Sequence, residues 1–519
     1  MLLQKIDNLP LKTLSLIIVV IAMMISAQVQ YIQHGWINPD SILYLESAKL
    51  LAIGDWEASF NVFPWPLYSL CVAGAHKLSG LSVHHSAQLL SVIFFGITTA
   101  SFVKIITLAG GKQRQIVAGG LVFFSAQYLV GGVLEMLMRD QGFWAFFLLS
   151  LVFFINYYKK NLVVDAFIWQ ICIIIAVLFR IEAITFLLLL PAILLFDIKS
   201  TFRERLISLI KCNFINIALC IGVVVFLILN TDVSTKFLGR LNEVFNADII
   251  NQLVHLFIQK SRIMSSQVLG DYLDEFAVPG LVLTLFYVMF LKAISATGLI
   301  NFVLAGFAIK AKPSLIDNRA YKVLCAVAII AIVNMALIIT KVFVLSGRYV
   351  LALSFILMIF AAFYLAYLFK YLDDGLMKPT SNGHKKKWLV MAMLLVMTLG
   401  IIKNILPKQN GYNHMQDAVV WVKNDNMNSK PIFYDDTRAR YYAQERFIGT
   451  WNDNWAKVSS AINDKSILKY DYLIINLSSK DPEKQQWLKE QLMQFDEAKT
   501  FYDAKKKKYT LVYKKHVAN

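Results

Sequence analysis

The sequence has little charge for its length. Only 16% of its 519 residues are Asp, Glu, Lys or Arg, whereas 57% are hydrophobic. This balance excludes a soluble globular protein built around one core, because such a fold cannot hide so much apolar surface. The composition predicts an α-helical polytopic membrane protein.

Cysteine is scarce, and internal repeats and long low-complexity tracts are lacking. The five cysteines form no CxxC pair and no regular ligand spacing, and most lie in or beside apolar runs. We therefore interpret them as small core residues rather than disulfides or metal ligands.

A dense basic tract is lacking too, although the net charge is +17. The Lys and Arg residues fall between hydrophobic runs and in a polar C-terminal region. This spacing is typical of a membrane topology signal, so we expect membrane lipids as surroundings and no nucleic acid as a partner.

Hydrophobic runs predict about eleven transmembrane helices. The first run, Leu11 to Ala27, lacks a convincing cleavage site and is interpreted as a signal anchor. Residues 280–291, which precede Lys292, are interpreted as an interfacial or re-entrant helix, with two spans in this region as the alternative. The expected spans are residues 11–32, 84–107, 115–134, 140–158, 163–179, 182–197, 212–230, 293–309, 322–341, 349–370 and 388–406.

Alternate connections carry the positive charge and are expected to be cytoplasmic. The outer side then holds a first loop (33–83), a long loop (231–279), several short turns and the whole region after Pro407. Residues 1–406 are predicted to form the transmembrane domain. Residues 407–519 are polar. Strands with adjoining helix and turn signals are predicted in KPIFYDDTRARYYA, YDYLIINLS and KYTLVYKK. A small α/β soluble domain is therefore expected there.

The first outer loop is rich in Trp, Tyr and Pro, which suits interfacial helices. After Asn38-Pro39 the apolar spacing predicts an amphipathic helix with Asp40 or Ser41 near its N-cap. Asp40 therefore has two readings, a helix cap or a group that performs chemistry as a general base or a cation ligand.

Charged residues at the outer ends of spans are costly unless they are paired or line a wet cavity. Arg139 and Asp140 open the fourth span, and Arg180 and Glu182 lie in a tight hairpin between two apolar runs. Each pair is either a structural anchor or part of a functional site.

Arg348 and Tyr349 open the tenth span at the same outer side. An arginine fork suits bidentate phosphate recognition, although an interfacial anchor is the alternative. Three arginines and one or two carboxylates on one face are suited to group transfer from a phosphate-linked donor whose lipid tail lies in the membrane.

In the order of these motifs along the chain, and in their common expected side of the membrane, the chain resembles the C-type (GT-C) membrane glycosyltransferases. The resemblance is in particular to the bacterial relatives of the protein O-mannosyltransferases and of the lipid A aminoarabinose transferase. The motifs that carry the resemblance are Asp40 followed by YLESAKLLAIGDW, the PxPLY segment from Pro64 to Tyr68, Arg139-Asp140, Arg180-x-Glu182, Arg348-Tyr349 and the outer C-terminal domain.

The resemblance implies a polyprenyl-phosphate sugar donor and an inverting transfer, with the first-loop acid as base or ligand of a divalent metal. Many relatives have two adjacent acids in that loop, whereas Asp40 is flanked by Pro39 and Ser41, so the metal stays an open question.

We therefore hypothesise a glycosyltransferase of the bacterial inner membrane whose active site faces the periplasm. Asp40 would take the acceptor's proton, Arg139, Arg180 and Arg348 would hold the departing phosphate, and Asp140 and Glu182 would orient the arginines. Tyr349 would pack on the isoprenoid or the sugar. The acceptor, a lipid, a glycan or a protein, stays open. The alternatives are a transporter or flippase of lipid-linked sugars, and a surface-polysaccharide polymerase or ligase with a diphosphate-linked donor.

Overall fold

The computed structural model describes residues 2–32, 37–197, 201–229, 248–270, 272–311, 315–372, 381–407, 413–449 and 453–516. The start of the expected first outer loop, 33–36, and residues 231–247 and 271 of the expected long outer loop lie outside the described residues. The chain forms two compact units. We call them the helical unit (Met1–Ala27, Leu89–Glu135 and Arg139–Ile405) and the mixed unit (Gln28–Gln88, Met136–Met138 and Leu406–Asn519).

Seven helical segments among the described residues are long and apolar enough to cross a membrane. All of them overlap spans expected from the sequence, although Asp274–Thr297 shares only residues 293–297 with the expected span 293–309. The seven are Leu11–Ile32, Val83–Leu108, Arg139–Lys160, Asp274–Thr297, Asn318–Val342, Gly347–Leu372 and His384–Ile405.

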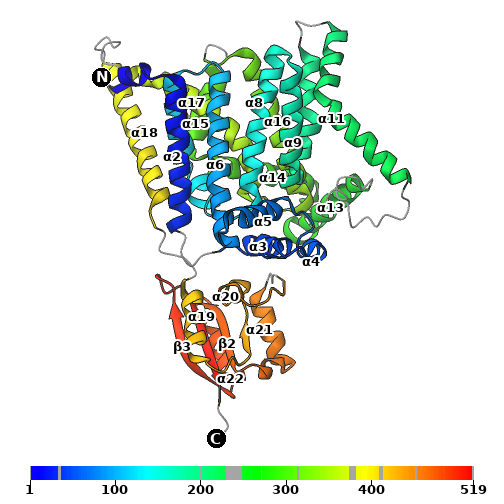
Figure 1. Cartoon of the computed structure of the whole chain (residues 1–519), viewed down its shortest axis with the longest axis vertical. Coiled ribbons are helices and arrows are strands. Elements are labelled where there is room, and N and C mark those ends of the chain that lie inside the picture. The colour runs from blue at the N-terminus through cyan, green and yellow to red at the C-terminus, as the bar shows by residue number, and fades with distance from the viewer. Residues whose placement is uncertain are drawn as a thin grey trace. The chain divides into compact units, whose positions relative to one another are not determined.

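Helices α2, α6, α8, α9 and α16 run side by side in Figure 1. The helices outside the first loop and the C-terminal domain are α1 (Leu2–Asp7), α2 (Leu11–Ile32), α6 (Val83–Leu108), α7 (Gln113–Ser125), α8 (Arg139–Lys160), α9 (Val163–Phe179), α10 (Ile184–Leu189), α11 (Phe202–Leu229), α13 (Ile249–Met264), α14 (Ala277–Thr297), α15 (Leu299–Ala311), α16 (Asn318–Val342), α17 (Leu351–Leu368) and α18 (Ser381–Ile405).

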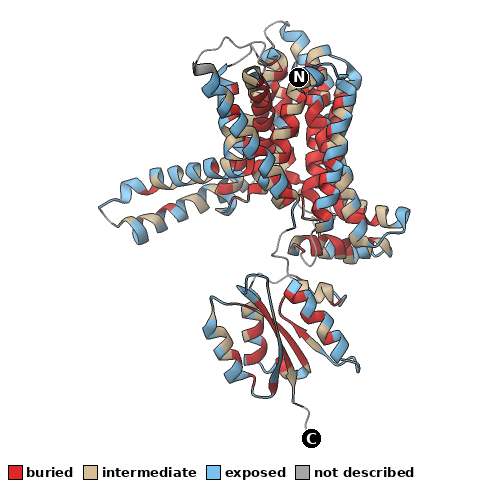
Figure 2. Ribbon diagram, turned by 90° about the vertical axis from the view of Figure 1, so that its left-hand side faces the viewer, coloured by how far each residue is buried: buried red, intermediate tan, exposed pale blue. Residues whose placement is uncertain are grey.

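Burial identifies α17 as the central helix, because almost every residue from Leu351 to Ala366 is buried. Helices α14 and α18 instead expose large apolar side chains, such as Leu283, Phe286 and Trp388. Figure 2 shows buried residues in the interior of this bundle and exposed ones around it. Apolar side chains on the outside of long apolar helices are stable in lipid rather than in water, so the unit is membrane-embedded.

The structure corrects the prediction for the segment around residue 290. Residues 280–291 are not a separate re-entrant helix but part of the continuous helix α14, and the expected span 293–309 is divided between α14 and α15. The break falls at Gly298, whose φ of 87° is a left-handed conformation that disfavours other residues.

Two other expected spans are also interrupted. Helix α7 ends at Ser125, and a separate π-helical turn, η1 (Leu129–Val133), follows it within the predicted span 115–134. The predicted span 182–197 consists of three pieces: η2 (Ile181–Ala183), α10 and η3 (Leu190–Phe196). Hydropathy predicted the apolar length of these segments but not their breaks.

The mixed unit contains three helices from the first loop and an α/β domain from the end of the chain. The loop helices are α3 (Pro39–Ala52), α4 (Trp56–Val62) and α5 (Leu67–Ser79). The domain comprises α19 (Asn413–Asp425), β1 (Ile432–Tyr434), α20 (Thr437–Tyr442), α21 (Asn454–Asn463), β2 (Tyr472–Ser478), α22 (Pro482–Gln491), β3 (Phe495–Tyr502) and β4 (Lys508–Lys515).

The four strands form one sheet in the order β1-β2-β4-β3, with β1 parallel to β2 and the other pairs antiparallel. Successive residues of β2 enter opposite cores: Leu473 packs with Val458 and Leu488, whereas Ile474 packs with Val419 and Ala439. Helices therefore cover both faces of the sheet. The expected strands are confirmed as β1, β2 and β4, whereas the polar edge strand β3 was not predicted.

Candidate functional site

Two polar sites stand out, and each is described within its own unit. The first, which we call the arginine cluster, comprises Arg139, Asp140, Arg180, Glu182, Arg348 and Tyr349 in the helical unit. Asp140 lies in the first turn of α8, and Arg180 is the residue that ends α9. Because consecutive helices connected by a short turn run antiparallel, these two ends lie at the same side of the bundle.

Arg180 is the centre of the arginine cluster. Its NH1 forms an ion pair with Oδ1 of Asp140, and its Nε lies 3.3 Å from Oε2 of Glu182. Arg180 is 4% exposed and Asp140 only 2%, so both charges lie away from water. A buried charge is tolerated only when it is paired, and here one guanidinium satisfies two carboxylates from different segments.

The remaining members surround this pair. NH1 of Arg348, in the turn η8 (Gly347–Val350), lies 3.9 Å from Oδ2 of Asp140. The ring of Tyr349 lies under the Arg180 guanidinium at 4.4 Å, and the charge of Arg139 acts on Glu182. The structure therefore brings together the residues of this unit that the sequence analysis selected at the ends of expected spans.

The arginine cluster gathers guanidinium groups from three segments of the chain. Arg180 and Arg348 both approach Asp140, and the charge of Arg139 acts on Glu182. A water-poor site lined by guanidinium groups attracts an anion, and phosphate is the group that matches the planar guanidinium fork. The arrangement can therefore bind a phosphate and stabilise negative charge on it.

Two glycines allow the helix ends to approach so closely. A Cβ on Gly142 would lie 2.3 Å from the ring of Phe179, the residue before Arg180. A Cβ on Gly347 would lie 2.5 Å from the ring of Tyr128. Both contacts are too short for any larger residue, so these glycines fix the positions of Arg180 and Arg348.

Asp40 belongs to the mixed unit, and the structure rules out the interpretation that it caps the first-loop helix. The N-cap of α3 is Asn38, whose side-chain oxygen accepts a hydrogen bond from the Asp40 N–H at 2.8 Å. The suggestion that Asp40 or Ser41 caps this helix is therefore wrong, because Pro39 already occupies the first helical position. The carboxylate of Asp40 lies in the first turn, where the helix dipole favours a negative charge.

Within the mixed unit Asp40 lines a cavity of about 560 Å³ together with residues of the α/β domain. Tyr441 of α20 connects the two parts, since its hydroxyl shares a hydrogen bond with Nδ1 of His84 at 2.9 Å. The ammonium of Lys49, on α3, lies 5.4 Å from the centre of the same ring. The first loop and the domain therefore share the walls of one cavity.

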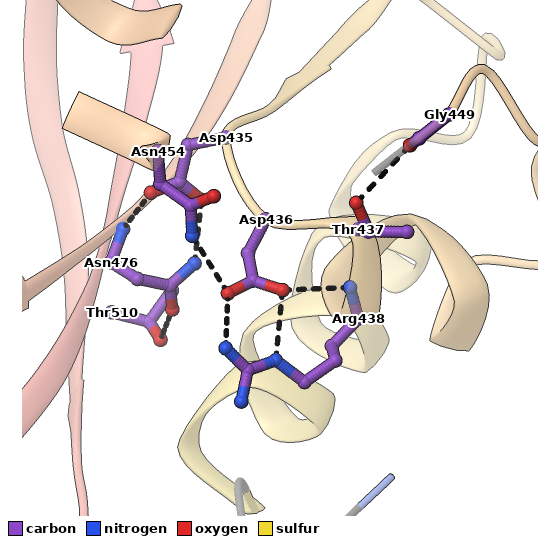
Figure 3. Close-up of polar contacts among 8 residues, drawn as sticks. All are labelled: Asp435, Asp436, Thr437, Arg438, Gly449, Asn454, Asn476 and Thr510. Carbon is purple, nitrogen blue, oxygen red and sulfur yellow. Dashed lines mark hydrogen bonds and ion pairs between the residues drawn. The ribbon is translucent and has the colours of Figure 1, made fainter. Parts of the chain in front are cut away.

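The second site, which we call the strand-edge network, lies where the parallel strands β1 and β2 end. Asp435 follows β1 directly and accepts hydrogen bonds from the backbone N–H and the side-chain amide of Asn476, at 2.7 and 2.6 Å. Thr510 of β4 donates to the carbonyl of the same amide at 2.6 Å. Figure 3 shows how these contacts hold Asn476 in one orientation.

Asp436, the next residue, caps α20 and binds Arg438 through both carboxylate oxygens, at 2.9 and 2.7 Å. Asn454 donates to the same carboxylate at 2.8 Å (Figure 3). The sequence interpretation missed this network. Its signal was the pair of aspartates directly after a strand, since the carboxyl ends of parallel strands are where α/β folds place ligands.

The two aspartates differ in their proton affinity. Burial, reinforced by the neighbouring charge of Asp436, raises the pKa of Asp435 to about 7. Burial also raises the pKa of Asp436, but the hydrogen bonds and charge of Arg438 outweigh it and hold that pKa below its ordinary value. Asp436 is therefore a fixed anion, whereas Asp435 titrates near neutrality.

The described ranges contain no group of three or more His, Cys, Asp or Glu side chains placed to hold a metal ion.

The seven long apolar segments found in the described part of the chain, together with a small α/β domain, define the class of the molecule as a membrane-embedded, mostly helical protein. A comparison with protein-family models and with curated proteins finds no match to the chain. The sites themselves therefore carry the functional argument.

Proposed function

We propose that the chain is an integral-membrane glycosyltransferase of the C type, which transfers a sugar from a polyprenyl-phosphate carrier to an acceptor. The observation that carries the proposal is the arginine cluster, in which guanidinium groups from separate segments converge on the buried Asp140, an arrangement that suits the phosphate of a membrane-bound donor. The lipid tail of such a donor is soluble only in the bilayer, beside apolar helices.

In the proposed reaction, an oxygen of the acceptor hydroxyl forms a bond to the anomeric carbon of the sugar. The bond between that carbon and the phosphate oxygen breaks, and its electron pair stays on the polyprenyl phosphate. The acceptor's proton passes to Asp40. Attack from the face opposite the phosphate inverts the anomeric configuration.

The cluster residues have distinct tasks in this proposal. Arg348 and Arg180 bind the phosphate and stabilise the charge that it gains on departure. Asp140 and Glu182 orient Arg180, and Arg139 adds to the positive field. Tyr349 presents an aromatic face to the donor. No step passes through a metal ion.

The finer topology also belongs to the proposal. We place the chain in a bacterial inner membrane, with about eleven spans once the short apolar helices are included. The first loop and the C-terminal domain then face the periplasm, because the basic connections lie on the opposite side.

A liposome assay tests the proposal. Purified protein is reconstituted with undecaprenyl-phosphate carriers that bear labelled sugars, and envelope glycans are added as acceptors. We expect a new glycosidic bond and release of undecaprenyl phosphate. Labelled carrier that crosses the bilayer without forming a bond would replace the proposal with a transporter. Stronger competition by undecaprenyl diphosphate than by the monophosphate would indicate a polymerase or ligase.

A further inference from the structure

The cavity of the mixed unit lies at the carboxyl ends of β1 and β2, the edge at which the strand-edge network is assembled. Its volume of about 560 Å³ falls within the range of small-molecule sites. Its walls come from several elements: α3 supplies Asp40, the start of α21 supplies Asn454 and Trp455, and β2 supplies Asn476.

The charges in the cavity wall largely neutralise one another. Asp436 is bound to Arg438, and Asp481 lies 3.5 Å from Lys484. Counting every lining residue, four carboxylates face three cations, since Lys508 is the remaining cation and burial lowers the pKa of His414 to about 4. This balance disfavours an anion such as phosphate and leaves hydrogen bonding as the main polar interaction.

The hydrogen-bonding groups in the wall are held in fixed positions. The amide of Asn476 is held by Asp435 and Thr510, and the amide nitrogen of Asn454 by Asp436. The carbonyl oxygen of Asn454 takes part in no hydrogen bond among the described residues. Preorganised amides and carboxylates beside one another present donors and acceptors together, which matches the adjacent hydroxyls of a sugar.

An aromatic face completes the wall. The half-buried ring of Trp455 meets the ring of Trp487 edge to face, with the ring centres 5.3 Å apart at an interplanar angle of 65°, and Nζ of Lys484 lies 5.4 Å from the centre of the Trp455 ring. A supported indole presents a rigid apolar face at low entropic cost. A sugar ring has one apolar face and a polar rim, so it fits a flat aromatic surface surrounded by polar groups.

We infer that this cavity binds a saccharide, and that the α/β domain holds the acceptor glycan there. The assignment of the saccharide as acceptor rests on the proposed function, because Asp40, the proposed base, lines the same cavity. Binding of the saccharide itself requires only the cavity.

An array of bacterial envelope oligosaccharides, probed with the full chain in nanodiscs, tests the inference. We expect wild-type protein to be retained on particular oligosaccharides and Asn454→Ala to weaken that retention about tenfold, as expected for losing a hydrogen bond or two. Asn463→Ala is the matched control, because Asn463 is exposed on the same helix and outside the cavity. Trp455→Ala should abolish retention and Trp455→Phe should restore part of it.

Hydrogen exchange of β2 and β4 in each variant shows whether the domain remains folded. Wild-type protein that binds no oligosaccharide, or folded Asn454→Ala and Trp455→Ala variants that bind like the wild type, would overturn the inference. Binding of undecaprenyl phosphate is measured separately on the same preparations. Wild-type protein that binds the oligosaccharide but not undecaprenyl phosphate would refute the proposed donor. Wild-type protein that binds undecaprenyl phosphate but no oligosaccharide would refute the saccharide site.

Discussion

Two regions of the molecule pair an aspartate with an arginine, and they do so differently. In the arginine cluster, Asp140 and Arg180 belong to different helices, and Arg348 approaches the same carboxylate from a third segment. In the strand-edge network, Asp436 and Arg438 are two residues apart and satisfy each other through two hydrogen bonds.

The difference indicates which ligand each region suits. The arginine cluster brings guanidinium groups from separate segments to one carboxylate, an arrangement that suits an anion. The pair in the strand-edge network is neutral within itself and leaves amides and an aromatic ring as binding groups, so it suits a neutral polar ligand. Similar residues therefore form two kinds of site, which we propose bind a phosphate and a sugar respectively.

The largest effect is expected at Asp40, which lines the proposed saccharide cavity. Asp40→Asn removes the proposed base, and loss of a positioned base costs roughly 10²–10⁴-fold in rate. Sugar transfer should therefore fall by that factor, while undecaprenyl-phosphate binding at the arginine cluster should not change. The matched control is Asp55→Asn in the same loop, because Asp55 only caps α4 and Asn caps equally well. Full activity of Asp40→Asn would contradict the assignment.

The next effect concerns the guanidinium groups of the arginine cluster. Arg348→Gln removes one positive charge and should weaken undecaprenyl-phosphate binding about 10- to 100-fold, as expected for a charge-assisted hydrogen bond. Saccharide retention on the array should not change. Lys341→Gln removes the same charge from the exposed end of α16 and should leave both unaffected. If both variants weakened undecaprenyl-phosphate binding equally, the cause would be the overall positive electrostatic field rather than a phosphate site at the arginine cluster.

A smaller effect is expected from the packing that holds Arg180. Gly142→Ala places a methyl group against the ring of Phe179 and should destabilise the helical unit by about 1–3 kcal/mol, the usual cost of overpacking. Gly306→Ala in α15 is the control, and it should change the stability in the opposite direction, because a Cβ at this position would meet no atom within 4 Å. A helical glycine replaced by alanine gains roughly 0.5–1 kcal/mol. Thermal unfolding of the full chain in nanodiscs measures both.

The smallest effect is a pH dependence that only the strand-edge network should show. The pKa of Asp435 is raised to about 7, so the folded domain holds a proton that the unfolded chain releases. This stabilisation is complete below the ordinary pKa of an aspartate and is lost as the pH rises through about 7, at about 1.4 kcal/mol per pH unit. His414, whose pKa is lowered to about 4, acts in the opposite direction as the pH falls through that value.

The difference between wild type and Asp435→Asn isolates the Asp435 contribution, because His414 is present in both. Hydrogen exchange of β1 and β2 in the full chain, corrected for intrinsic rates, should show the stability advantage of the wild type declining from pH 5 to pH 8. A difference that is flat with pH would show that Asp435 is already ionised in the folded domain.

The arginine cluster was largely predictable because it depends on topology alone. Asp140 begins one apolar run and Arg180 ends the next, so hydropathy and the antiparallel order of spans place them on one side. Which atoms pair could not be predicted, since this depends on the close contact that Gly142 permits with Phe179.

The remaining features depend on local geometry. The cap of α3 is Asn38 rather than Asp40, because Pro39 fixes where the helix starts. The break at Gly298 follows from one backbone angle that hydropathy does not report. The strand-edge network joins β1, α21 and β4, which lie far apart in the sequence, so the sheet order had to be known before Asp435 and Asn476 could be connected.

The most direct test of the central claim is a structure of the full chain in nanodiscs with undecaprenyl phosphate bound. The account predicts phosphate density within hydrogen-bonding distance of the guanidinium groups of Arg180 and Arg348, with the isoprenoid tail along the apolar helices. Phosphate density elsewhere, with Arg180 and Arg348 contacting only Asp140 and Glu182, would contradict it.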